Sequence, residues 1–375
     1  MPLRANVTDF WQRWREPQYT EVTTNGEADG AAEKDDRISK PLRPLGRLPV
    51  ACLLIVAILI ALLWVYDELD NTFNKTPKSR PCKNITVRRE WRSLDPSEKT
   101  NFVNAIHCIA KTPSSWEQNR NTTIYDDFAI LHGGIGSWCH RSASFLPWHR
   151  YTLAIFENIL KTKCGFEGAI PYWDWSLDWA NLANSSIWSS SSGFGGDGDP
   201  LGTETVGGGR CVTDGPFSDL RPIIYNHTYI PHCISRGFKD IKTNITGQIS
   251  GRPFSPESMG AILGKQTYKE FVKEVENQLH NSLHQSVNGD FKAMTAANDP
   301  LFYVHHAQLD RMWWRWQREK PEVRLHEYSG RHMFNSTNGT ASVNDMLLYA
   351  GFAKDMPVAS VMDTEGRFLC YRYMY

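Results

Sequence analysis

The chain has no excess of charge of either sign. Its 375 residues include 41 lysines and arginines and 41 aspartates and glutamates, so the formal net charge is zero at pH 7. A nucleic-acid-binding protein usually carries a basic excess or a basic patch. The composition therefore predicts no nucleic-acid partner.

Two short motifs of common hydrolases are also missing. The chain has no Gly-x-Ser-x-Gly nucleophile elbow, although His132-Gly133-Gly134 is similar to part of an esterase oxyanion loop. It also lacks His-Glu-x-x-His, on which many catalytic zinc sites are built. These absences argue against a serine esterase and against a zinc protease of that type.

Long apolar runs are scarce, and the one at residues 48–66 (LPVACLLIVAILIALLWVY) contains no charge. It is long enough for a helix that crosses a bilayer core of about 30 Å. Basic residues precede it and acidic residues follow it, which predicts a cytosolic N-terminus. We therefore expect a disordered cytosolic tail at 1–47, a transmembrane signal anchor at 48–66, a stem at 67–80 and one folded domain at 81–375. A cleaved signal peptide is the alternative, but the preceding stretch is long and no small-residue cleavage site follows the run.

Glycosylation sequons and cysteines predict that the folded domain is lumenal or extracellular. Of the 8 cysteines, only Cys52 lies in the apolar run. The others could form up to three disulfides in the secretory pathway and leave one thiol over, with a pairing that the sequence does not fix. One sequon, Asn6, precedes the run, and those that follow it include Asn84, Asn121, Asn184, Asn226, Asn244, Asn335 and Asn338.

Histidines near the C-terminal end of the chain form one candidate metal site. Asp299 and Pro300 are typical of an N-cap and a first helical position, so His305 and His306 fall in the second turn of a helix. Asp310 follows His306 by four residues, where a carboxylate can orient a metal-binding imidazole. Upstream, His280 and His284 have the i,i+4 spacing that can point two imidazoles at one ion.

A second histidine group lies earlier in the chain. His132, His140 and His149 are separated by intervals of eight and nine residues, which do not share one helix face. We expect them at a helix end, in a glycine-rich loop and on the following helix. Two groups of three imidazoles without a carboxylate at ligand spacing favour copper over calcium or magnesium. Zinc, which commonly takes three ligands and a water, is the rival metal.

Helical patterns surround both groups. They begin at Asp95-Pro96-Ser97-Glu98, which is typical of a capping box, and recur at 125–132, 144–163, 267–285 and 299–317. Between them, residues 185–216 are rich in serine and glycine and predict a long loop. After Pro321 the pattern changes to short strands and turns.

The motifs together closely resemble the tyrosinase family of type-3 copper proteins, in particular its short fungal tyrosinases and catechol oxidases. The resemblance covers nearly all of residues 81–375. Its motifs are Arg88-Arg89-Glu90-Trp91, Pro171-Tyr172-Trp173-Asp174-Trp175, Gly215-Pro216-Phe217, Asn298-Asp299-Pro300-Leu301-Phe302, His305-His306, Asp310-Arg311 and Tyr371-Arg372-Tyr373.

The resemblance implies a mainly α fold, with a four-helix bundle around a dinuclear copper site, long loops and a few short strands. It implies that Phe302 stacks near the site and that His305 is a neighbour of the ligands. One copper would be held by His132, His140 and His149, and the other by His280, His284 and His306.

The family chemistry implied is oxidation of phenols with dioxygen as co-substrate. A monophenol is hydroxylated, an o-diphenol is oxidised to an o-quinone, or both, and the substrate would be a small phenolic or tyrosine-containing precursor of a pigment or secondary metabolite. Glu276 and Asn281 match positions that hold a water for phenol deprotonation in relatives. The alternative is a hemocyanin-like protein that binds dioxygen reversibly, although neither a covering domain nor repeated copper domains are visible in the sequence.

Two departures from the family pattern concern covalent chemistry. Many relatives link a cysteine to the second histidine of the first copper, with the cysteine two residues earlier; here Cys139 directly precedes His140, so we do not expect that link. The longer enzymes also carry a C-terminal domain that covers the site until it is removed. This sequence ends two residues after Tyr373, and we expect no such processing.

Overall fold

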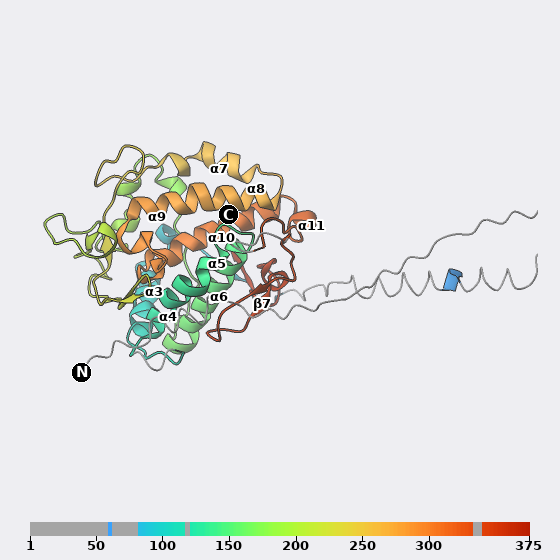
Figure 1. Ribbon diagram of the computed structural model, residues 1–375, viewed down its shortest axis with the longest axis horizontal. Helices are drawn as coiled ribbons and strands as arrows, with labels where there is room; N and C mark the ends of the chain where they lie inside the picture. The colour runs from blue at the N-terminus through green and yellow to red at the C-terminus, as the bar shows by residue number, and fades with distance from the viewer. Residues whose placement is uncertain (1–58, 62–81, 117–120, 333–339) are drawn as a thin grey trace, which may run out of the picture. The chain divides into compact units, whose positions relative to one another are not determined.

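The structure is a computed structural model that describes residues 59–61, 82–116, 121–332 and 340–375 (Figure 1). The expected tail and stem, and nearly all of the expected anchor, lie outside these residues. Within them, no helix combines the length and apolar character that a bilayer span requires.

Helices dominate the domain, as the sequence predicts. α3 begins with the expected capping box, in which the Glu98 side chain accepts a hydrogen bond from the Asp95 backbone N–H at 2.8 Å. The helices are α3 (Pro96–Ile109), α4 (Ile124–Leu131), α5 (Ser137–Cys139), α6 (Phe145–Cys164), α7 (Pro256–Leu263), α8 (Tyr268–Glu274), α9 (Asn281–Val287), α10 (Leu301–Glu319) and α11 (Pro321–Arg324).

Two π-helical turns interrupt this pattern, η2 (His132–Gly136) and η8 (Val275–His280). η2 continues α4 into α5, and η8 joins α8 to α9. Short π turns inside α-helices are rare and frequently lie at functional sites. Each of these turns contains one histidine of a predicted ligand group.

The bundle consists of α4, α6, the continuous α8–η8–α9 segment and α10. α10 contacts both α6 and η8, and it runs through the middle of the domain (Figure 1). It is buried on nearly all sides from Leu301 to Trp314, which is typical of a central helix. The expected start of this helix is shifted by one residue, because Pro300 is the N-cap and Asp299 accepts a hydrogen bond from the Leu301 N–H at 3.0 Å.

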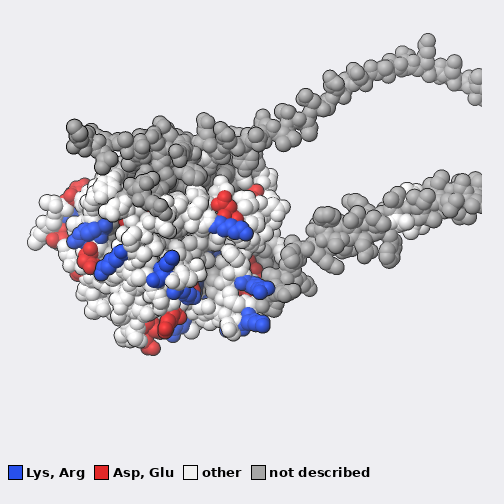
Figure 2. Space-filling model, turned by 90° about the horizontal axis from the view of Figure 1, so that it is seen from below, with Lys and Arg blue, Asp and Glu red and all other residues white. Residues whose placement is uncertain are grey.

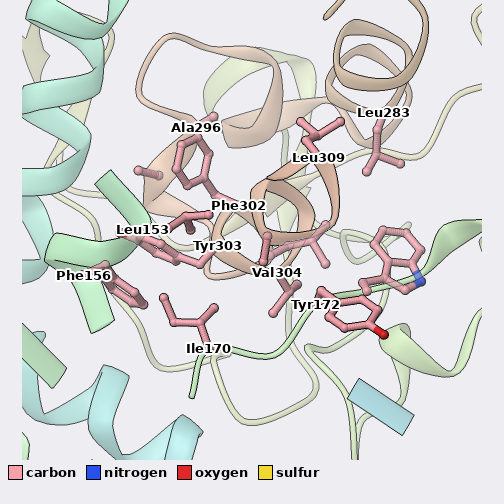
Figure 3. Close-up of a cluster of buried hydrophobic side chains, with 14 of the residues drawn as sticks. Leu153, Phe156, Ile170, Tyr172, Leu283, Ala296, Phe302, Tyr303, Val304 and Leu309 are labelled. Carbon is pink, nitrogen blue, oxygen red and sulfur yellow. The ribbon is translucent and has the colours of Figure 1, made fainter. Parts of the chain in front are cut away.

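The core around α10 is aromatic. Tyr303 of α10 stacks on Phe156 of α6 with ring centroids 3.5 Å apart, and Phe302, Val304 and Leu309 extend the same cluster (Figure 3). Large buried aromatic side chains contribute strongly to stability through apolar burial. This packing fixes the position of α6 relative to α10. Each of these two helices carries a histidine of one group.

Short strands pair at the periphery. β1 (Thr86–Arg88) lies parallel to β8 (Tyr371–Tyr373), with Val87 opposite Arg372. The other pairs are antiparallel: β2 (Arg210–Cys211) with β5 (Ser235–Arg236), β3 (Ile224–Tyr225) with β4 (Thr228–Tyr229), and β6 (Met346–Leu347) with β7 (Met356–Pro357). The few short strands therefore agree with the expected fold class.

Three disulfides form among the described cysteines, Cys82–Cys370, Cys108–Cys164 and Cys211–Cys233. Cys139 is buried and is in no disulfide, so it is the thiol left over. Its thiol donates to the Gly136 carbonyl at 2.9 Å. The described cysteines thus form the maximum of three disulfides that the sequence predicts, and the fold determines their pairing.

The serine- and glycine-rich stretch at 185–216 is a packed loop with short 3-10 turns and strand β2. Phe194 is fully buried, and a Cβ on Gly193 would lie 2.2 Å from the Ile187 carbonyl oxygen. Glycine is required there because the backbone approaches itself closely. On the face seen in Figure 2, lysines and arginines lie among aspartates and glutamates.

Candidate metal centre

The first histidine group is assembled from three consecutive elements. His132 begins η2 at the end of α4, His140 directly follows α5, and His149 lies in the first turns of α6. One nitrogen from each imidazole lies within 4.8 Å of the corresponding nitrogens of the other two. The structure therefore brings these three side chains together as predicted.

The second group forms in the same way from the other half of the bundle. His280 ends η8, His284 lies one turn later in α9, and His306 lies in α10. Their nitrogen atoms also lie within 4.8 Å of one another, and all three side chains are buried. Of the six histidines, only His140 is partly exposed.

The two groups face each other across the bundle. The rings of His149 and His306 stack with centroids 4.2 Å apart, and the centroids of His140 and His280 are 5.5 Å apart. Phe302 lies beside both groups, 4.1 Å from the His306 ring and 5.0 Å from the His132 ring. Phe302 therefore lies near the site, where the resemblance places it.

Five of the six imidazoles have an acceptor at Nδ1. The acceptors are Met294 O for His132 at 2.5 Å, Gly136 O for His140 at 2.7 Å, Phe145 O for His149 at 2.8 Å, Asn281 Oδ1 for His280 at 3.0 Å, and Phe291 O for His284. A neutral imidazole that donates from Nδ1 has its lone pair on Nε2. The surroundings thus select the tautomer that presents Nε2 to a metal ion.

The Nε2 atoms lack the partners that buried nitrogens normally have. In the described part of the chain, Nε2 of His280 and His284 and both ring nitrogens of His306 are buried without a hydrogen bond. A buried polar atom left unpaired costs about 1–3 kcal/mol. Nε2 of His132 lies 3.2 Å from Nε2 of His149, so two lone pairs face each other. A cation bound to each group removes both costs, and three imidazole nitrogens are a donor set that suits copper.

Burial also keeps these histidines neutral, as ligation requires. It lowers the pKa of His140 to about 4 and that of His284 to about 3. The pKa values of His132, His149, His280 and His306 are also lowered well below the ordinary value, by burial together with their histidine neighbours. The site is therefore ready to bind a cation at neutral pH without releasing ring protons.

His305 differs from its neighbour His306 in its contacts, and from the five histidines bonded at Nδ1 in its tautomer. Its Nδ1 accepts a hydrogen bond from Trp175 Nε1–H at 3.1 Å, so its proton is on Nε2. It is fully buried, and its ring centroid is 5.3 Å from that of His284. His305 thus packs beside His284. Its Nε2 is also buried without a hydrogen bond to any described residue, and that it does not bind metal stays a prediction.

Asp310 does not have the predicted role of a hydrogen-bond partner of His306. Its Oδ1 accepts from Arg150 Nε at 2.5 Å, and its Oδ2 accepts from the hydroxyls of Tyr371 at 2.5 Å and Tyr373 at 2.6 Å. Helical spacing places Asp310 on the correct turn, but a buried arginine and two tyrosines from distant segments occupy its oxygens. Asp310 instead ties α10 to α6 and to β8.

Glu276 and Asn281 lie beside different ligands. Both carboxylate oxygens of Glu276 accept the backbone N–H of Arg141, at 2.8 and 2.9 Å, directly after His140. Burial raises the pKa of Glu276 to about 7, and the Arg141 N–H opposes that rise. Asn281 contacts His280 through its Oδ1. Both residues therefore border the site, as the family positions imply.

Sequence reasoning missed the acceptors that fix the imidazoles. The carbonyl groups of Met294 and Phe291 belong to the segment between α9 and α10, and no side-chain pattern marks a carbonyl as an acceptor. The two π turns were missed as well: the glycines of His132–Gly136 predict a loop after residue 132, and Val275–His280 fits the ordinary helix predicted over 267–285.

Comparisons with known proteins agree with this geometry. The family model for the common central domain of tyrosinase matches residues 122–319. Tyrosinase ustQ of Aspergillus flavus is 65% identical over 293 residues, which cover 78% of this chain and 80% of that protein. Among solved structures, a polyphenol oxidase mutant from Thermothelomyces thermophila has a TM-score of 0.68 at 23% identity, covering 83% of this chain and 95% of that one. A functional unit of octopus hemocyanin has a TM-score of 0.51 at 19% identity, covering 77% and 68%; at these identities both structures show the fold alone.

Proposed function

The chain belongs to the tyrosinase family, and on this premise we propose that each of the two histidine groups holds one copper ion. The protein is a copper-dependent oxidoreductase that oxidises phenols with dioxygen. The observation that carries the ligand assignment is that each group brings three imidazole nitrogens within 4.8 Å of one another, while five of the six Nδ1 atoms are bonded elsewhere and Nε2 of His280, His284 and His306 is buried without a partner in the ranges that the structure describes. When bound, the copper pair supplies the two-electron chemistry with dioxygen, and the protein supplies positioning and exclusion of water.

The substrate reaches the site from the side of His140. This is the one histidine of the six that is partly exposed, and the other five are buried. Phe145 lies between the groups, with its ring centroid 4.8 Å from His149 and 4.9 Å from His280. An aromatic wall of this kind favours a planar phenol ring and disfavours water.

Glu276 is the residue best suited to take the proton of a monophenol. A carboxylate with a pKa of about 7 is both deprotonated often enough and basic enough to act near neutral pH. It lies beside the backbone that follows His140, on the side where that histidine is exposed. Asn281 would help to hold a water between Glu276 and the phenol. This supports monophenol hydroxylation in addition to diphenol oxidation.

Replacement of each residue tests this role. Glu276→Gln should lower monophenol oxidation about 10-fold or more and leave catechol oxidation within about twofold. Asn281→Gly also removes the acceptor of His280 Nδ1, so it should lower both activities, and monophenol oxidation the more. Glu157→Gln is the control, because Glu157 is a buried carboxylate of α6 that pairs with Arg88 at 2.9 Å. An unchanged ratio of the two activities in both site variants would remove the assignment of Glu276 and Asn281.

The reaction itself is tested with the purified chain, copper and catechol. We expect oxygen consumption and a brown quinone product that both require copper. A protein that only binds dioxygen reversibly would show an oxygen-dependent absorption band without quinone, and that result would favour the hemocyanin-like alternative.

The natural substrate is a phenolic or tyrosine-derived precursor of a pigment or secondary metabolite. His140 is the one histidine of the two groups that is partly exposed, which supports entry of the phenol from that side. Comparison of metabolites between a deletion strain and its parent should reveal an accumulated unoxidised phenol. No change in phenolic metabolites would contradict this proposal.

The domain works in the secretory pathway or outside the cell, anchored through residues 48–66. The three disulfides agree with an oxidising compartment, and the uncharged run supports a single-pass anchor with a cytosolic N-terminus. Glycosidase treatment should increase the mobility of the protein on gels, and alkaline carbonate should leave it in the membrane pellet. Release by carbonate would contradict the anchor.

A further inference from the structure

We propose that Asp290 is a positioning residue for both histidine groups at once, acting through the segment 289–298 that joins α9 to α10. This inference rests on the proposed copper ligation. The segment comprises the 3-10 turns η9 (Gly289–Lys292) and η10 (Ala296–Asn298) with the residues between them. It contains no ligand of either group.

The segment contacts one imidazole of each group through its backbone. The Phe291 carbonyl accepts from Nδ1 of His284, and the Phe291 ring stacks on the His284 ring with centroids 4.3 Å apart. Three residues later, the Met294 carbonyl accepts from Nδ1 of His132 at 2.5 Å. The same short segment therefore fixes the tautomer and ring orientation of one histidine in each group.

Asp290 is the residue that anchors this segment. It is fully buried, and its Oδ1 accepts from His232 Nε2 at 2.9 Å and from Asn298 Nδ2 at 3.0 Å. Its Oδ2 accepts from the backbone N–H of Ser235 at 2.8 Å. Because Asn298 ends the segment, Asp290 joins its first turn to its last and both to β5.

The cation that balances Asp290 is His232. Nδ1 of His232 faces the Ile230 carbonyl at 2.6 Å while Nε2 faces Asp290, so both ring nitrogens act as donors and the ring carries a charge. A buried carboxylate without such a partner would be strongly unfavourable. Cys233, which follows His232, is held by the disulfide to Cys211, and this fixes the cation in place.

Further contacts seat the segment against the first group. The Tyr125 hydroxyl of α4 donates to the Asn298 carbonyl at 2.9 Å, and α4 ends at His132. The Asn226 N–H donates to Thr295 Oγ1 at 3.1 Å. At the other end, Gly289 has φ +55°, and a Cβ there would lie 2.1 Å from the Ser235 carbonyl oxygen. The segment is thus fixed at both ends, and the carbonyls of Phe291 and Met294 lie between these fixed points.

The test compares Asp290→Asn with wild type and with the matched control Glu157→Gln. Glu157 is also a buried carboxylate that accepts from a cation, Arg88, but it lies two turns beyond His149 on α6. We expect Asp290→Asn to weaken copper affinity, measured by chelator competition, by about 10- to 100-fold, as changes around metal ligands typically do. Both copper equivalents should be lost together. Glu157→Gln should lower the melting temperature of the metal-free protein and leave copper affinity within about twofold.

Electron paramagnetic resonance distinguishes the loss of one copper from the loss of both. A single Cu(II) ion gives a signal, whereas a coupled pair is silent, so loss of one ion only would appear as a new signal. That signal, or a copper affinity equal to wild type, would overturn the proposal. If Asp290→Asn does not fold, His232→Gln carries the same test, because it removes the cation and leaves Asp290 in place. Failure of wild type to bind two copper equivalents would instead refute the proposed function.

Discussion

The two histidine groups reach similar geometry by different means. In the first group, His140 and His149 donate to carbonyls four residues earlier, Gly136 and Phe145, so the backbone of the same stretch orients them. In the second group, His280 uses the side chain of Asn281 and His284 uses Phe291 in the following segment. His306 has no hydrogen bond within the described residues and is held by the packing of α10. Two histidines of the first group are therefore oriented by local backbone, and His280 and His306 of the second by a side chain and by packing. His132 and His284, one from each group, depend on carbonyls of residues 289–298.

Removal of one ligand from either group should have the largest effect. His149→Gln and His306→Gln each leave three nitrogens at only one copper, so phenol oxidation should fall by about 1,000-fold or more, because the two-electron reaction needs both ions. Oxygen uptake with catechol measures this. His326→Gln, an exposed histidine outside the site, should retain wild-type activity. Substantial activity in either ligand variant would show that one group is dispensable.

A methyl group inserted beside the first group should have a smaller effect than the loss of a ligand, and it should weaken copper binding at that group only. A Cβ at Gly136 would lie 3.1 Å from the His132 ring and 3.2 Å from Trp148. Gly136→Ala should therefore destabilise the protein by about 1–3 kcal/mol and weaken copper binding at the first group. Gly260→Ala in α7, where a Cβ meets open space, is the control and should be neutral or stabilising. Equal thermal stability of the two variants would contradict this packing.

These regions also show what the sequence could predict. Helix starts such as Asp95–Glu98 and the i,i+4 pair His280–His284 are local signals, and both were found. The partners of Asp310 lie on α6 and β8, and the acceptors of His132 and His284 are carbonyls of residues 289–298, so none of them has a local signature. Family resemblance supplied the choice of His306 over His305 as the third ligand of the second group, which spacing alone left open. The disulfide pairing likewise depends on the tertiary fold.

The pH dependence of monophenol oxidation tests the role of Glu276, which lies beside the first group. Since burial raises the pKa of Glu276 to about 7, its basic form is lost as pH falls through 7, and monophenol oxidation should fall with it. Catechol oxidation should depend less on pH in this range. A monophenol profile that is flat across neutral pH in wild type would contradict the role of Glu276.

The same shift predicts a stability effect. A raised carboxyl pKa means that the folded protein holds this proton more tightly than the unfolded chain does. The burial of Glu276 therefore costs nothing below the ordinary pKa of 4.5 and costs increasingly as pH rises toward about 7. The melting temperature of Glu276→Gln relative to wild type should rise over that interval. A difference independent of pH would contradict the shift.

The smallest effect is expected next to the second group, at the hydrogen bond between Trp175 and His305. Trp175→Phe removes the donor to His305 Nδ1, which should cost about 1–3 kcal/mol of stability because both groups are buried. Copper content should stay at the wild-type value, since His305 is not a ligand in this account. Loss of a copper equivalent in Trp175→Phe would show that His305 or its setting takes part in binding.

Copper titration of the metal-free chain tests the central claim most directly. The account predicts two equivalents per chain, one for each histidine group, with no electron paramagnetic resonance signal from the fully oxidised pair. His149→Gln and His306→Gln should each bind one equivalent tightly and give the signal of a single Cu(II) ion. A wild-type chain that binds only one equivalent, or two equivalents that survive either substitution, would contradict it.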